Sequence, residues 1–381
     1  MNKTMKILLV AALAVMTSAA AMAQVPMHVC AYVNDNNYYF PNNAEGYMIG
    51  PGEATHVGPY VTNGLGSGDD VYQGGLAAAR EGDLYVEDPG SVPVNITHFS
   101  INKTDCTLSL DTSLYPDGNA DASFGDRLAI TPDGKTMFVG SDDYNNIYSL
   151  AIAGNGSLGS PVAEASTPGT KAGFEVSPDG KALVVGYPDN QEICAYPISK
   201  RHLGTPNCQP TVDYLDLISI DPASACVYGA ETSSSSDTSE VEAFTLTGGV
   251  LGTPTDYKPF GPGGGADGIL VSSDNKTIYL TEDTAQMAMG SVAPGCRLTY
   301  KTTISDGTFY YDAPGQIAQA KTDPEYVVNG DGNLFCPTMG IFHVGVNGKL
   351  TPIGSGQLPL LQGGDVDGVD PSSIVVVGPS N

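Results

Sequence analysis

Residues 126–159 read DRLAITPDGKTMFVGSDDYNNIYSLAIAGNGSLG, and this stretch contains one complete structural repeat of the chain. Its apolar runs at 128–130, 136–139 and 147–152 are short and bounded by turn residues, which is typical of strands. In the turn at 131–134 a proline presets φ and a glycine allows positive φ. A fourth strand follows the Gly-Asn-Gly turn, so the stretch predicts one four-stranded antiparallel blade of a β-propeller.

The same turn recurs along the chain at nearly regular intervals. The counterparts of Thr131 are Arg80, Ser177, Asp221, Ser272, Asp323 and Asp370, of which Arg80 and Asp323 match less well. The successive intervals are 51, 46, 44, 51, 51 and 47 residues. Propeller repeats have this length. Seven turns therefore predict an all-β protein, a seven-bladed β-propeller with four-stranded antiparallel blades.

Both termini are expected to lie in one blade. The N-terminal stretch CAYVNDNNYYFPNN (30–43) resembles a second strand and EGYMIG (45–50) a third. GVDPSSIVVVG (368–378) supplies the missing first strand, and this closure removes an exposed sheet edge. Because 30–33 and 374–377 both resemble a second strand, the sequence leaves open which segment takes that place.

Residues 1–23 have the features of a secretory signal peptide. Lys3 and Lys6 precede an apolar run at 7–15, and Ala-Met-Ala at 21–23 matches a cleavage site. The apolar run is too short to cross a membrane, and no later stretch is long enough. We therefore expect an exported protein, periplasmic or extracellular, whose residues 24–381 form a single propeller domain.

The composition is strongly acidic. Sixteen Lys and Arg stand against 42 Asp and Glu, which gives a formal net charge of −26. Such a surface repels nucleic acids and anionic lipids, so a role in binding either is excluded.

Seven cysteines suit an oxidising compartment. Cys194 and Cys208 are symmetric about the turn at 200–202, which places them opposite one another on antiparallel strands and predicts a disulfide. A weaker expectation pairs Cys296 with Cys336. Cys30 and Cys226 have the same register in non-adjacent blades and should not meet.

The repeat at 126–159 and the stretch VSPDGKALVVGYPDNQEICAYPI (176–198) resemble the lactonase-type seven-bladed propellers. These include 6-phosphogluconolactonase-like proteins and YVTN-repeat surface proteins, and the resemblance covers most of residues 28–378. It implies the architecture more than the activity, because one fold carries many functions. Enzymes of the family use His, Arg and Glu near the central channel. This chain offers few such residues, with histidine only at 28, 56, 98, 202 and 343 and arginine at 80, 127, 201 and 297.

Aspartates recur five residues before the turn, at Asp126, Asp216, Asp267 and Asp365. First strands are innermost in a propeller, so equal offsets predict a ring of carboxylates around one channel mouth. Carboxylate oxygens are ligands for Ca²⁺, which makes the ring a candidate metal site. The alternative is that aspartate simply suits the turn that enters a strand.

Two functions remain open. The scarcity of catalytic residues favours a non-catalytic exported binding scaffold that uses loops or the channel mouth on one face. Its partner would be an unknown protein or a small carbohydrate-like ligand. The alternative is a lactonase-like hydrolase of the 6-phosphogluconolactonase type acting on a sugar lactone, for which Arg127 with Asp126 and Asp267 is the candidate catalytic set.

Overall fold

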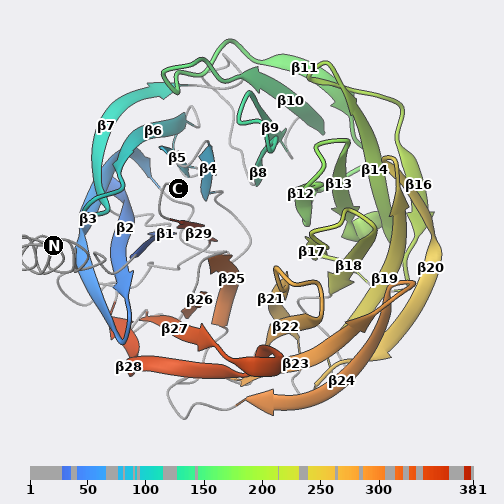
Figure 1. Cartoon of the computed structure of the whole chain (residues 1–381). Coiled ribbons are helices and arrows are strands. Elements are labelled where there is room, and N and C mark those ends of the chain that lie inside the picture. Colours follow the sequence, from blue (N-terminus) through green and yellow to red (C-terminus); the bar gives the residue numbers. More distant parts are fainter. Residues whose placement is uncertain are drawn as a thin grey trace, which may run out of the picture.

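The computed structural model describes residues 28–35, 41–65, 76–79, 82–88, 91, 95–114, 127–141, 145–212, 214–230, 239–261, 265–282, 286–304, 314–320, 326–331, 338–359 and 373–378. These residues form seven antiparallel sheets arranged as blades around a central axis (Figure 1). The predicted all-β seven-bladed propeller is therefore confirmed. No helix of the described residues is long and apolar enough to cross a membrane. The predicted signal peptide, residues 1–23, lies outside the described residues.

In each blade the strands succeed one another from the axis outward. Blade 1 consists of β29 (Ser373–Val377), β1 (Val29–Asn34), β2 (Pro41–Gly50) and β3 (Glu53–Leu65). Blade 2 consists of β4 (Leu76–Ala79), β5 (Asp83–Asp88), β6 (Asn95–Asn102) and β7 (Thr107–Leu114). Blade 3 consists of β8 (Arg127–Ile130), β9 (Thr136–Ser141), β10 (Asn146–Ala151) and β11 (Val162–Ser166). Blade 4 consists of β12 (Phe174–Val176), β13 (Ala182–Tyr187) and β14 (Glu192–Ser199), and η1 (Pro188–Asn190) lies between β13 and β14. Two short strands, β15 (His202–Leu203) and β16 (Asn207–Pro210), both pair with β14 on its outer side.

The remaining blades have the same order. Blade 5 consists of β17 (Leu217–Ile220), β18 (Cys226–Ala230), β19 (Glu240–Thr247) and β20 (Val250–Pro259), and blade 6 of β21 (Ala266–Val271), β22 (Thr277–Glu282), β23 (Gln286–Ala293) and β24 (Arg297–Ile304). Blade 7 consists of β25 (Pro314–Ala320), β26 (Tyr326–Asp331), β27 (Thr338–Val344) and β28 (Leu350–Pro359), with η2 (Val346–Gly348) in the last turn.

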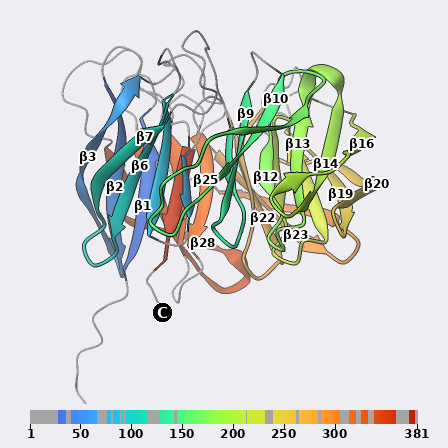
Figure 2. The ribbon, with the colours of Figure 1, turned by 90° about the horizontal axis from the view of Figure 1, so that it is seen from above.

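The strands run between two opposite faces of the ring (Figure 2). One face carries the turns from first to second strand and from third to fourth strand, such as 131–135 and 152–158 in blade 3; we call it the turn face. The other carries the connections from second to third strand and from one blade to the next; we call it the loop face. The inner strands β4, β8, β12, β17, β21, β25 and β29 adjoin one another around the axis.

The repeated turn is built by the same hydrogen bonds in four blades. At Thr131, Ser177, Asp221 and Ser272 the carbonyl accepts the N–H of the residue three positions later, at 2.7–2.9 Å. The side chain of this first residue also caps the next strand. The Ser177 hydroxyl accepts the N–H of Ala182 at 3.0 Å, and Oδ1 of Asp221 accepts that of Cys226 at 2.9 Å. A short oxygen-bearing side chain makes this cap, which explains why these four positions hold Thr, Ser or Asp.

The closing blade answers one open question and corrects one expectation. β29 pairs with β1 from Cys30 opposite Val377 to Asn34 opposite Ser373. Residues 30–33 therefore belong to the second strand, and 374–377 to the first. The assignment of Asp370 to a turn between first and second strands is wrong, because Asp370 precedes β29. The two strands come from opposite ends of the chain, so no turn joins them.

Buried tyrosines on second strands reach across to the next blade. The hydroxyl of Tyr32 donates to the carbonyl of Cys106 at 3.0 Å, and that of Tyr279 to the carbonyl of Gly348 at 2.7 Å. Tyr85 makes the equivalent bond to Gly156 at 2.5 Å. Each acceptor lies in the turn between the third and fourth strands of the following blade and has positive φ. The turn conformation thus presents a carbonyl to the neighbouring blade.

Two disulfides use the same contact between blades. Cys30–Cys106 joins β1 to the β6–β7 turn, and Cys226–Cys296 joins β18 to the β23–β24 turn. The predicted bridge Cys194–Cys208 is confirmed, across the β14–β16 pair. The pairing of Cys296 with Cys336 is wrong because Cys296 lies against the second strand of the preceding blade. As expected, Cys30 and Cys226 do not pair with each other.

Replacing Cys226 and Cys296 by serine should lower the free energy of unfolding by about 4 kcal/mol, and the same change at Cys194 and Cys208 by about 3 kcal/mol. The first bridge spans 70 residues and the second 14, so the first restricts the unfolded chain more. Urea denaturation of the two double variants and the wild type measures both losses. A smaller loss for the bridge between blades than for the bridge within blade 4 would contradict this order.

Candidate functional site

The inner strands begin at the loop face, and two of the four aspartates predicted to form a ring belong to the described residues near these strand starts. Asp216 directly precedes β17, is half-buried and donates its N–H to the carbonyl of Ala230 at 3.0 Å. Asp267 is the second residue of β21. Asp126 and Asp365 lie outside the described residues. The ring, and the Ca²⁺ that it would hold, stay predictions.

Two backbone features weaken the expectation of a regular ring. In blade 6 the pairing shifts from Ala266 opposite Glu282 to Gly268 opposite Thr281, so Asp267 is the extra residue of a β-bulge. A bulge interrupts the alternation of side chains, so equal offsets do not imply equal directions at this position. Asp365, moreover, lies well before β29, whereas Asp126 and Asp216 directly precede their inner strands. The offset from Asp370 therefore does not place Asp365 in the ring.

Arg127, the first residue of β8, lies at the boundary of blades 3 and 4. It is half-buried, and its Nε donates to the carbonyl of Ala172 at 2.5 Å. Ala172 occupies the blade 4 position that corresponds to the aspartates. The hydrogen bond fixes the guanidinium against the next blade, so a delocalised positive charge lies at the boundary of blades 3 and 4, near the starts of their inner strands.

Lys171 brings a second cation to the same boundary. It is 2% exposed, and its Nζ donates to the hydroxyl of Thr167 at 3.1 Å and to the carbonyl of Gly169 at 3.4 Å. Its aliphatic stem packs over Gly140, which pairs with Arg127 in the β8–β9 ladder. Sequence reasoning missed Lys171. The sequence does contain a signal for it: the repeat of blade 4 has alanine at 172, where other repeats have aspartate, and a lysine stands directly before that alanine.

A buried polar network lies on the loop-face side of the boundary between blades 1 and 2. Asp88, at the end of β5, is fully buried. Its Oδ1 lies 2.9 Å from Nδ2 of Asn42 and 2.6 Å from the hydroxyl of Thr62, and its Oδ2 accepts from Thr97 at 3.0 Å. Among the described residues no lysine or arginine makes an ion pair with it. The network ties the third and fourth strands of blade 1 to the second and third strands of blade 2.

The Thr62 hydroxyl that contacts Asp88 has a second acceptor within reach. The Thr62 hydroxyl lies 3.0 Å from the carbonyl of Asn42 as well as 2.6 Å from Asp88, and it carries only one proton. If Thr62 donates to Asn42, a protonated Asp88 can donate to Thr62 and satisfy both groups. Burial also raises the pKa of Asp88 to about 7. Desolvation thus outweighs the hydrogen bonds from Thr62, Asn42 and Thr97, which favour the ionised form, and keeps Asp88 neutral below about pH 7.

Glu45 and His56 form a second buried pair within blade 1. Oε2 of Glu45 and Nε2 of His56 are 2.5 Å apart on the paired strands β2 and β3, and Glu45 is fully buried. Burial raises the pKa of Glu45 and lowers that of His56, so both shifts favour the neutral forms. The pair lies on the third and fourth strands of its blade, away from the channel. We assign it to the internal structure of blade 1.

Asp88→Asn should flatten the dependence of stability on pH. The pKa of Asp88 is about 7 in the folded protein and 3.8 as the ordinary value, so the folded state binds more protons between these pH values. Its contribution to stability is therefore complete at low pH and is lost as the pH rises through 7, by up to about 4 kcal/mol.

Urea denaturation at about pH 5 and about pH 8 measures the part of this loss that falls between pH 5 and 7, about 3 kcal/mol. We expect the wild type to lose more stability over this range than Asp88→Asn. Glu45, whose pKa burial also raises to about 7, adds a comparable slope that is common to both proteins. The exposed Asp189→Asn serves as the charge-matched control and should behave as the wild type. Identical slopes for Asp88→Asn and the wild type would show that Asp88 is ionised throughout.

No family model and no curated protein sequence matches the chain. Solved structures do. A periplasmic gluconolactonase of Pseudomonas aeruginosa is 16% identical with a TM-score of 0.70, over 93% of this chain and 100% of that one. A candidate 6-phosphogluconolactonase of Bacteroides fragilis is 16% identical with a TM-score of 0.70, over 93% of this chain and 99% of that one. A hypothetical selenium-binding protein of Sulfolobus tokodaii is 11% identical with a TM-score of 0.68, over 95% of this chain and 96% of that one. At these identities the likeness concerns the fold, and the chain has the fold of the lactonase-type seven-bladed propellers.

Proposed function

We propose that the protein hydrolyses a neutral sugar lactone at the loop-face mouth of the channel, next to Arg127. The observation that carries the proposal is the fixed guanidinium at the start of an inner strand, with buried Lys171 beside it. Two proteins of the same fold are described as lactonases, one of them a gluconolactonase. The sequence alone favoured a non-catalytic scaffold, but these likenesses support the hydrolase better.

Lactone hydrolysis needs little machinery. Water adds to the ring carbonyl, the carbonyl oxygen gains negative charge in a tetrahedral intermediate, and the ring C–O bond breaks to give a hydroxy acid. A positive charge held near that oxygen stabilises the intermediate more than the substrate. A nearby carboxylate can take the proton of the attacking water. No cofactor is required for this balance of atoms and protons.

Arg127 is suited to the first of these roles. Its anchored Nε removes much of the freedom of the side chain, so little reorganisation is needed when charge develops on the substrate. Lys171 is too deeply buried to reach a substrate and contributes through its field. Charge–charge interactions across short distances are much stronger at a partly buried site than in bulk water.

Asp216 is the described candidate for the base, since it is half-buried and directly precedes an inner strand. The catalytic set predicted from the sequence was Arg127 with Asp126 and Asp267, and Asp267 is the second residue of β21, an inner strand.

The charge of the protein points to a neutral substrate. A net charge of −26 repels a phosphorylated lactone, whereas an uncharged sugar lactone approaches freely. The product is a carboxylate, and the same field favours its release. Three disulfides are consistent with an oxidising compartment, and we place the protein in the periplasm or outside the cell.

Purified protein should open glucono-1,5-lactone faster than the spontaneous reaction, measured by acid release in a pH-stat. Arg127→Gln should lower kcat/KM by about 100-fold, the size expected when one stabilising donor is removed from a tetrahedral intermediate. Arg297→Gln removes the same charge from an exposed position at the start of β24 and should leave the rate unchanged. No rate above the spontaneous reaction would return the protein to the non-catalytic binding role.

A further inference from the structure

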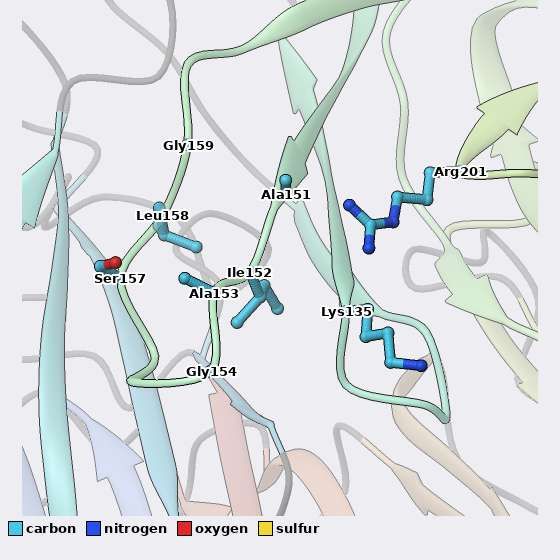
Figure 3. A pocket seen from close by; sticks show the side chains of 9 residues that line it. All are labelled: Lys135, Ala151, Ile152, Ala153, Gly154, Ser157, Leu158, Gly159 and Arg201. Carbon is cyan, nitrogen blue, oxygen red and sulfur yellow. The ribbon is translucent and has the colours of Figure 1, made fainter.

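A pocket opens on the turn face where blades 3 and 4 meet (Figure 3). It encloses about 480 Å³. Blade 3 contributes the β8–β9 turn with Lys135, and the end of β10 with the following turn, including Ile152 and Leu158. Blade 4 contributes Arg201 from the β14–β15 turn. In the view of Figure 3, Arg201 and Lys135 lie on one side of the 151–154 segment, and Ser157 and Leu158 on the other.

Two positive charges at one pocket are unusual in a protein with 16 Lys and Arg against 42 Asp and Glu. The guanidinium of Arg201 makes no ion pair with any described residue. Lys135 is only loosely paired. Its Nζ lies 3.6 Å from Asp133, whereas the equivalent lysines Lys181 and Lys276 lie 2.8 and 3.1 Å from their aspartates. Both cations are therefore available to a ligand.

The position of Arg201 is set by the backbone of its turn and by contacts of the two residues that follow it. Lys200 and Arg201 have φ of 51° and 74°, which sets the course of the turn. The next two residues are then clamped to blade 3 by Glu164 of β11. Oε1 of this carboxylate lies 3.0 Å from Nδ1 of His202, and Oε2 accepts the N–H of Leu203 at 3.1 Å. The clamp crosses the blade boundary and holds the arginine over the pocket.

The pocket is separate from the channel mouth. Arg127 begins β8 at the loop face, whereas Lys135 follows the other end of β8 at the turn face. A ligand in this pocket therefore contacts none of the residues proposed for lactone hydrolysis, and its binding does not depend on that function.

We propose that this pocket binds a small organic anion with a single carboxylate, of the size of a sugar acid. The planar fork of Arg201 matches a carboxylate, and Lys135 adds a point charge. Ile152 and Leu158 offer an apolar wall for the carbon face of the ligand, and the volume suits a molecule of monosaccharide size. The Asp133 carboxylate lies 3.6 Å from Lys135, and Glu164 accepts the N–H of Leu203, two residues after Arg201, so these negative charges disfavour a doubly charged phosphate.

Isothermal titration with galacturonate, its uncharged methyl ester and inorganic phosphate tests the proposal on the full mature chain. Galacturonate should bind about tenfold more tightly than the ester or phosphate at low salt. Lys135→Gln with Arg201→Gln should weaken galacturonate binding about tenfold or more. The control pair Lys181→Gln with Arg297→Gln removes the same charge from the equivalent turn and an exposed strand start, and should leave affinity within about twofold.

Three results would overturn the proposal. These are absence of galacturonate binding to the wild type, equal losses in the two double variants, and binding of the ester or of phosphate as tight as that of galacturonate. Thermal unfolding of both double variants checks that each is folded. Because none of these measurements uses a lactone, failure of the anion site leaves the proposed hydrolase untouched, and the reverse also holds.

Discussion

The pairing of β29 with β1 is the constraint on which the rest of the ring depends. Five residue pairs join the last strand of the chain to the first. β1 serves both sides of its blade, because Val29, Ala31 and Val33 pack towards blade 7 while Cys30 and Tyr32 pack towards blade 2. Without β29, this central strand has an open inner edge and the ring has a gap. Closing the ring costs chain entropy, because β29 and β1 are separated by almost the whole sequence.

In the closed ring one type of contact recurs between neighbouring blades, but the bond that forms it differs from boundary to boundary. The start of a second strand lies against the turn between third and fourth strands of the next blade. At some boundaries a tyrosine hydroxyl binds a turn carbonyl, as in Tyr85 with Gly156 and Tyr279 with Gly348. At others a disulfide takes the same place, and at the boundary of blades 1 and 2 both occur. The geometry of the boundary is thus maintained along the chain, whereas the bond that secures it varies.

The local repeat could be predicted from the sequence because its turn chemistry is local. Thr131, Ser177, Asp221 and Ser272 each close the same hydrogen-bonded turn, and blade number follows from their spacing. Register between distant segments could not be predicted in the same way. The apolar run 374–377 fits a first or a second strand equally well, since Ile374 and Val377 are buried, as the residues of β1 are. The bulge at Asp267 likewise depends on the partner strand and leaves no mark in its own residues.

The candidate sites were harder to predict than the fold for a related reason. Arg127 was found because it follows one of the recurring aspartates, but Lys171 became visible only when two blades were placed side by side. The polar stretch around Asn42 has the composition of a surface loop, yet much of it is buried against Asp88. Burial of polar groups depends on partners from another blade, which composition does not reveal. Cys30 and Cys296 show the same limit, because each pairs across a blade boundary.

The three disulfides also share an order along the chain. Cys30 joins Cys106, Cys194 joins Cys208 and Cys226 joins Cys296, so each bridge links a cysteine to the next cysteine in the sequence. A chain delivered from its N-terminus into an oxidising compartment meets each correct partner before any other thiol arrives. Native connectivity then follows from the direction of delivery, without reshuffling by thiol–disulfide exchange. Cys336 emerges last, when the earlier thiols have already been consumed.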